Sequence, residues 1–125
     1  AMPTPRAARG LIRTRQGLQL AFEEADGQAR IAMETPGGQR LALSDGPAGI
    51  EITDANGNAV LMAADGVTVT AAGRVAVDAA QVDLTASVLT VNAGMSKFSG
   101  VVQCDTLIAN SVVSASYTPG AGNVY

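Results

Sequence analysis

The chain has 125 residues and a formal net charge of −3, with 8 Lys and Arg residues against 11 Asp and Glu residues. This acidic balance gives no basis for nucleic-acid binding. The sequence contains no histidine, which excludes Ser-His-Asp and Cys-His nucleophiles, histidine metal sites and a histidine general base. Hydrophobic residues make up 47% of the chain but aromatic residues only 3%, so we expect a narrow core built from small side chains.

Residues 1–16 are rich in Pro and Arg and show no periodicity. They are predicted to be an arm or linker from an upstream domain. The start of the sequence shows no signal-peptide pattern, and no apolar run approaches the roughly 18–20 residues of a transmembrane helix. Secretion by the ordinary route is therefore not expected.

Residues 17–66 are predicted to form the wider base of a β-prism. Short runs alternate apolar and polar residues, the period of strands with one wet face. Gly, Asp, Asn and Pro separate these runs, as in β-turns, and Asn56-Gly57 is a turn dipeptide that needs a positive φ. The apolar alternation lies at 18–22, 31–33, 41–43, 50–52 and 60–62.

Residues 67–100 are predicted to form the most regular part of the fold. A unit of apolar, polar, apolar, polar and alanine residues recurs four times, at 67–71, 75–79, 82–86 and 89–93. The step of eight and then seven residues leaves no room for helices or long loops, and it suits a strand solenoid in which the chain climbs at each corner.

Strands this short cannot enclose a core alone, so identical chains around a common axis are expected to supply the other apolar faces. The predicted fold is all-β: an intertwined triple-stranded β-helix, or β-prism, formed by a homotrimer and narrowing toward the C-terminus. The residues predicted to form the trimer core are Val67, Val69, Val75, Val77, Val82, Leu84, Leu89 and Val91.

Residues 101–125 are predicted to be a tip region, where the apolar residues Val102, Leu107, Val112 and Tyr117 follow at steps of five. The single cysteine, Cys104, cannot form an intrachain disulfide and is expected to be a small buried strand residue. Asp78 and Asp83 could act as a carboxylate pair, but on the convex face of a solenoid they would have no pocket, so no enzyme activity is expected. No cofactor is expected.

Three stretches resemble the needle part of spike proteins from contractile injection systems. They are TPGGQ at 35–39, IEITDANGN at 50–58 and GVTVTA at 66–71. The end of the chain, VQCDTLIANSVV at 102–113 and SYTPGAGN at 116–123, is similar to the end of such spikes. The family includes the phage baseplate assembly protein V type and the valine-glycine repeat proteins of type VI secretion.

The resemblance implies a triple-stranded β-helix that projects from a baseplate hub at the tail tip of a phage or injection particle, assembles in the cytoplasm and breaches a target envelope mechanically. The upstream barrel of full spikes is not visible in residues 1–30, so a fragment is expected. Some members hold iron through an apical His-x-His, which is missing here, so a blunt end that accepts a separate PAAR-type tip protein is expected. Its predicted contact residues are Val112, Val113, Tyr117, Val124 and Tyr125.

Two other interpretations remain open. A trimeric stalk of a phage tail fibre or adhesin shares the fold logic, but it should carry an aromatic-rich receptor-binding head. A monomeric β-solenoid enzyme such as a polysaccharide lyase needs more rungs and a groove of charged residues.

Overall fold

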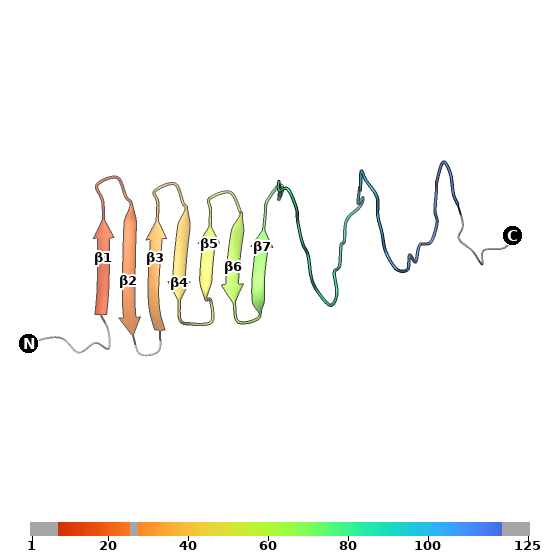
Figure 1. Cartoon of the computed structure of the whole chain (residues 1–125). Coiled ribbons are helices and arrows are strands. Elements are labelled where there is room, and N and C mark those ends of the chain that lie inside the picture. The colour runs from red at the N-terminus through yellow and green to blue at the C-terminus, as the bar shows by residue number, and fades with distance from the viewer. Residues whose placement is uncertain (1–7, 26–27, 119–125) are drawn as a thin grey trace, which may run out of the picture. The chain divides into compact units, whose positions relative to one another are not determined.

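The structure is a computed structural model that describes residues 8–25 and 28–118. The chain divides into two units, Ala1–Gln81 and Val82–Tyr125. The first unit contains one seven-stranded sheet whose strands lie side by side in chain order (Figure 1). The strands are β1 (Ala8–Arg13), β2 (Gln19–Ala25), β3 (Gln28–Glu34), β4 (Arg40–Ser44), β5 (Ile50–Thr53), β6 (Ala59–Ala63) and β7 (Gly66–Thr70).

Every strand of the sheet pairs antiparallel with the next one along the chain. The described residues contain strands and no helix, which confirms the predicted all-β class. The five alternating runs predicted between 18 and 62 fall on β2 to β6. The connectivity differs from the expected solenoid, because the chain turns back at each strand end instead of climbing at a corner.

Tight turns explain why the chain turns back. The connections after β1, β3 and β5 lie at the same end of the sheet (Figure 1) and each carries a glycine with positive φ: Gly17 at 97°, Gly38 at 98° and Gly57 at 92°. Glycine adopts this left-handed conformation without the steric cost of a Cβ. The prediction for Asn56-Gly57 is therefore confirmed at Gly57, whereas no described non-glycine residue has a positive φ.

The arm predicted over residues 1–16 is partly replaced by β1. In β1, Gly10 pairs with Phe22 and Ile12 pairs with Leu20 of β2. The alternation of this strand is hard to see in the sequence, because Leu11 and Ile12 are adjacent and arginines flank them. Residues 8–13 form a strand because their backbone pairs with β2, whose own alternation is clear.

Of the four regular repeats, only the first lies in a strand paired within the chain, as β7. The repeats at 75–79, 82–86 and 89–93 belong to no strand ladder within the described residues, and Figure 1 draws them without arrows. A strand needs a neighbouring strand to accept and donate its backbone hydrogen bonds. These repeats have the alternation of strands but are not paired with another strand in the described chain.

The second unit bends at regular intervals. Bends fall at Ser87 and Gly94, seven residues apart, and later at Asp105, Asn110 and Ala115, five residues apart. At the last of these, the Ser114 hydroxyl donates to the Ser116 carbonyl and accepts from the Ser116 N–H at 3.2 Å. The bends follow the seven-residue step and then the five-residue step of the apolar positions.

Candidate functional site

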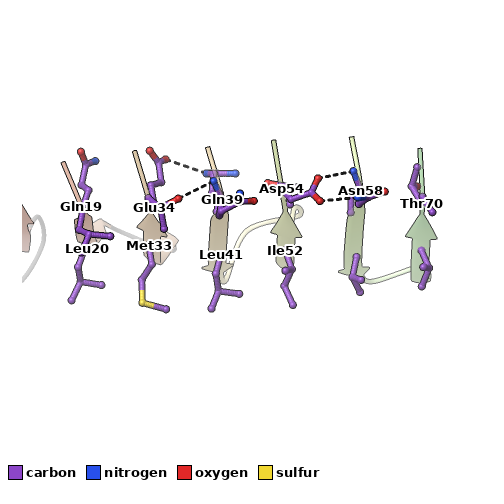
Figure 2. Close-up of a pocket in the computed structure, with 18 of the residues that line it drawn as sticks. Gln19, Leu20, Met33, Glu34, Gln39, Leu41, Ile52, Asp54, Asn58 and Thr70 are labelled. Carbon is purple, nitrogen blue, oxygen red and sulfur yellow. Dashed lines mark hydrogen bonds and ion pairs between the residues drawn. The ribbon is translucent and has the colours of Figure 1, made fainter. Parts of the chain in front are cut away.

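One face of the sheet carries two continuous rows of apolar side chains. Each strand contributes one residue to each row, and these two residues are two positions apart, as Leu20 and Phe22 are in β2. Side chains two positions apart in a strand point to the same face, so both rows lie on one face. Figure 2 shows Leu20, Met33, Leu41 and Ile52 of the first row in line and pointing to the same side. The first row is Ile12, Leu20, Met33, Leu41, Ile52, Val60 and Val69, and the second is Gly10, Phe22, Ile31, Leu43, Ile50, Met62 and Val67. We call them together the apolar face.

The apolar face has no second layer over it within the described chain. Met33 is 42% exposed, Phe22 44% and Val69 60%. Among the described residues only Ala42 is a buried hydrophobic residue. Removing apolar surface from water is worth about 25 cal/mol per Å², and a single layer leaves most of this gain unrealised. The face needs a partner layer to become a core.

A trough of about 840 Å³ runs along the first apolar row. Its polar lining residues stand at the strand ends, and several of them, including Gln39, Asp54 and Asn58, already hydrogen-bond within the turns. A small-molecule pocket usually presents a few polar groups that converge on the ligand. Among the described residues of the trough, no polar groups converge on one point, so the trough resembles a protein–protein interface more than a small-molecule pocket.

The opposite face mixes small, polar and apolar residues. Its central row consists of Leu11, Ala21, Ala32, Ala42, Glu51, Leu61 and Thr68. Three of the small side chains expected in a narrow core therefore lie opposite the apolar face. Beside this row, the Arg40 guanidinium bridges Glu34 at 3.3 Å and Glu51 at 3.2 Å. Such partly exposed ion pairs contribute about 0–1 kcal/mol each. Only its charged side chains, such as Glu34, Arg40 and Glu51, are suited to contact with water.

Three five-residue turns at one end of the sheet have the same hydrogen-bond pattern. In each turn the first side chain accepts the N–H of the fifth residue: Thr14 from Leu18 at 3.0 Å, Thr35 from Gln39 at 3.2 Å, and Asp54 from Asn58 at 2.9 Å. The fourth residue is the glycine with positive φ. These bonds fix the turn length and therefore the register of the strands that it joins.

The three turns also stack on one another. A Cβ added at Gly38 would lie 3.1 Å from Ala55 Cβ, and one at Gly57 would lie 3.5 Å from Ala72 Cβ. The side chain of the fifth residue also accepts a backbone N–H from the next level of the stack. Gln39 Oε1 accepts from Ala55, the second residue of the following turn, at 3.3 Å. Asn58 Oδ1 accepts from Ala72, in the segment that follows β7, at 2.8 Å. We call this arrangement the stacked turns.

The Asp54 carboxylate is the charged group of the stacked turns. Its Oδ2 accepts from Asn58 Nδ2 at 2.7 Å, and its Oδ1 accepts from the Asn58 N–H at 2.9 Å (Figure 2). Its Oδ1 also accepts from the Asn56 N–H at 2.9 Å. These bonds, that from the Asn58 side chain above all, lower the pKa of Asp54 from its usual 3.8 because they favour the ionised carboxylate. Asp54 is held as an anion at neutral pH.

Residues 30–96 match the family described as the phage baseplate V C-terminal trimerisation domain. The match covers more than half of the 125 residues. The chain belongs to this family. The suspected resemblance is thereby confirmed, and membership supports a homotrimer and a structural role in a phage baseplate, at the tail tip. No curated protein matches the chain.

The trimerisation domain places its predicted core residues in two settings. Val67 and Val69 lie on the apolar face, one in each row. Val75 lines the same trough just beyond β7. The others follow in the part without strand pairing, and every one is exposed within the single chain: Val77, Val82, Leu84, Leu89 and Val91. Their role as a trimer core stays a prediction.

Sequence reasoning missed most of the apolar face as a single feature. Six of the seven strands that build it, β2 to β7, were predicted, but the site prediction began at Val67. The signal was present in the alternation of Leu20 with Phe22, Leu41 with Leu43, and Ile50 with Ile52. What could not be seen is that the hairpin registers bring these pairs into two unbroken rows.

The predicted tip residues lie partly in the described residues of the second unit, beyond the range 30–96 that matches the family. Val112, Val113 and Tyr117 are exposed there, Val113 at 97%. Val124 and Tyr125 lie outside the described residues. Cys104, expected to be buried in a strand, is exposed and unpaired with any strand in the single chain. The burial expected for it requires a neighbour that one chain does not provide.

The described part of the chain offers neither a metal site nor a membrane-spanning helix. No group of three or more His, Cys, Asp and Glu residues among residues 8–25 and 28–118 is arranged to hold a metal ion. Nor does this part contain a helix with the length and apolar character to span a membrane. Asp78 and Asp83, considered as a carboxylate pair, lie on exposed backbone and line neither of the two hollows described for the chain.

Proposed function

We propose that three copies of this chain form the rigid spike of a contractile injection apparatus. In this proposal the apolar faces of three sheets turn toward a common axis, and the repeats at 75–79, 82–86 and 89–93 pair between chains as an intertwined triple-stranded β-helix. The spike acts mechanically: it transmits thrust to a target envelope without chemistry. Its base joins a baseplate hub or upstream barrel, and its C-terminal end carries a PAAR-type tip.

The observation that carries the proposal is the apolar surface left uncovered in one chain. The apolar face spans all seven strands, and the following apolar positions, from Val75 at 62% to Val91 at 68%, are exposed as well. A monomer would keep this surface in water and would leave the strand-like repeats without a neighbouring strand. Three copies around an axis cover the surface and remove the free edges together.

The proposed tip contact is supported by the apolar residues of the second unit. Val112, Val113 and Tyr117 are exposed near the end of the described chain, and Asp105 is the one charged residue between 98 and 118. A weakly charged apolar surface of this kind suits a protein contact.

The first experiment is the solution mass of the chain by light scattering, before and after heating in detergent. A mass of three chains that resists this treatment is expected, because separating intertwined chains breaks many hydrogen-bond ladders together. A stable monomer would overturn the proposal. Pull-down of a PAAR-type protein, compared with pull-down of envelope glycans, then separates the spike from a receptor-binding fibre stalk.

A further inference from the structure

The chain leaves the sheet at a point that is held by a side chain. Just after β7, the backbone N–H of Ala72 donates to Asn58 Oδ1 at 2.8 Å. The same Asn58 side chain donates through Nδ2 to Asp54 Oδ2 at 2.7 Å. One amide therefore connects an anion in the β5–β6 turn to the backbone that departs from β7.

The segment that follows β7, residues 71–75, has the position of a fourth stacked turn but lacks the residues that form one. Ala71 stands where Thr14, Thr35 and Asp54 stand, and it has no side-chain oxygen to accept a hydrogen bond. Arg74 stands where the positive-φ glycines stand, and it does not adopt that conformation. The chain consequently does not fold back into an eighth strand. The contact from Asn58 nevertheless persists, with the geometry of the earlier stacked turns.

We propose that Asp54 and Asn58 form a clasp that sets the register in which the chain passes from pairing with itself to pairing with the other two copies. This inference rests on the proposed trimeric spike. Side chains of a strand alternate faces, so a shift of one residue would send Val75 and Val77 to the wrong side. The clasp supplies a fixed starting point, because Asp54 orients the Asn58 amide and the amide holds Ala72.

The equivalent contact inside the sheet, between Gln39 and Ala55, is less important for the register of the strands around it. Gln39 Oε1 accepts from Ala55 at 3.3 Å, but the residues around both turns continue into β4, β5 and β6, whose ladders hold the register independently. Beyond Ala72 no strand ladder follows within the described chain. Loss of the contact should therefore matter more at Asn58 than at Gln39.

The test uses the full chain and two ways of removing the contact. Asn58→Leu removes the acceptor. Ala72→Pro removes the donor and leaves Asn58 in place, and a proline already occupies the equivalent position of an earlier turn as Pro36. The matched controls are Gln39→Leu and Ala55→Pro. The measurements are solution mass and hydrogen exchange of backbone amides, read separately for residues 72–93 and for β3 to β6.

Both clasp variants are expected to raise amide exchange over residues 72–93 about tenfold relative to β3–β6, and to lower the temperature at which the trimer dissociates. The two controls should leave exchange over 72–93 at the level of the unmodified chain. This selective change is not expected from a general loss of sheet stability, which would raise exchange in β3–β6 as well.

Two outcomes would overturn the inference, and they are distinguishable. If the unmodified chain is a trimer and both clasp variants keep its exchange and dissociation temperature, the clasp has no role in register. If the unmodified chain is a monomer, the proposed spike fails first and the clasp fails with it.

Discussion

Pro36 lies beside Gly17 of the preceding turn, and its Cγ is 3.2 Å from where a Cβ on that glycine would stand. At the equivalent position of the later turns, Ala55 and Ala72 each donate an N–H to the amide of Gln39 or Asn58. Pro36 has no N–H to donate. Leu18, which holds the position of Gln39 and Asn58 in the first turn, has no side-chain oxygen to accept one. Because Pro36 lacks the donor and Leu18 lacks the acceptor, the contact between these two turns leaves no polar group without a hydrogen bond.

The Leu18–Pro36 pair can be exchanged for the polar version found elsewhere. Pro36→Ala alone should lower stability by about 0.5–1 kcal/mol, because the proline restricts the unfolded chain at a compatible φ. Adding Leu18→Gln should recover about 0.5–1.5 kcal/mol, because the new side-chain oxygen can accept the backbone N–H that Pro36→Ala restores. A double-mutant cycle on the denaturant midpoint measures this coupling. Strictly additive effects would contradict the pairing.

The hydrogen bonds of Asp54 should make the stability of the fold depend on pH in the acid range. Its pKa is lowered in the folded chain, so its contribution is fully present above the ordinary value of 3.8 and is lost as the pH falls through the lower folded pKa. Thermal unfolding at pH 7, 4 and 2.5 should therefore show a decline at the acid end that Asp54→Asn reduces. Asp65→Asn, a carboxylate in the exposed turn between β6 and β7, is the control. An equal reduction in both variants would contradict the assignment to Asp54.

The apolar face predicts opposite results for two neighbouring residues of β7. Val69→Asp puts a charge on the face proposed to meet the trimer axis, where three unpaired carboxylates would be desolvated together, and should abolish the trimer. Thr68→Asp places the same charge on the opposite face and should leave the trimer intact. The readout is solution mass by light scattering. A normal trimer from Val69→Asp would show that this face does not form the core.

The turn between β4 and β5 predicts a strong effect at one glycine. Gly49 has φ +68°, and a Cβ there would overlap the Met62 carbonyl oxygen. Gly49→Ala should cost at least about 1–3 kcal/mol from the left-handed conformation alone, and more from the overlap. Gly73→Ala, where a Cβ would meet nothing within 4 Å, is the matched control. Similar denaturant midpoints for both variants would contradict this packing.

Much of the strand content could be predicted from the sequence, because alternation with turn residues between the runs is a local signal. Leu41 and Leu43, or Ile50 and Ile52, mark their strands without outside information. β1 could not be predicted in this way, since Leu11 and Ile12 are adjacent and its strand character depends on pairing with β2. The fold-back at each turn was also missed. It depends on how Thr14, Thr35 and Asp54 bond across their turns, and no alternation pattern reports that.

The sequence by itself determined the all-β class, the one-sided apolar alternation, the lack of histidine chemistry and the resemblance that the family match confirmed. These follow from residue types and their spacing, which are local. The tertiary structure alone decided that β1 to β7 form one antiparallel sheet, that its apolar side chains align in two rows, and that Asn58 holds the departing chain at Ala72. Each of these depends on contacts between residues distant in sequence, such as the strand ladders and the bond of 2.8 Å between residues 58 and 72, and such contacts form only in the folded chain.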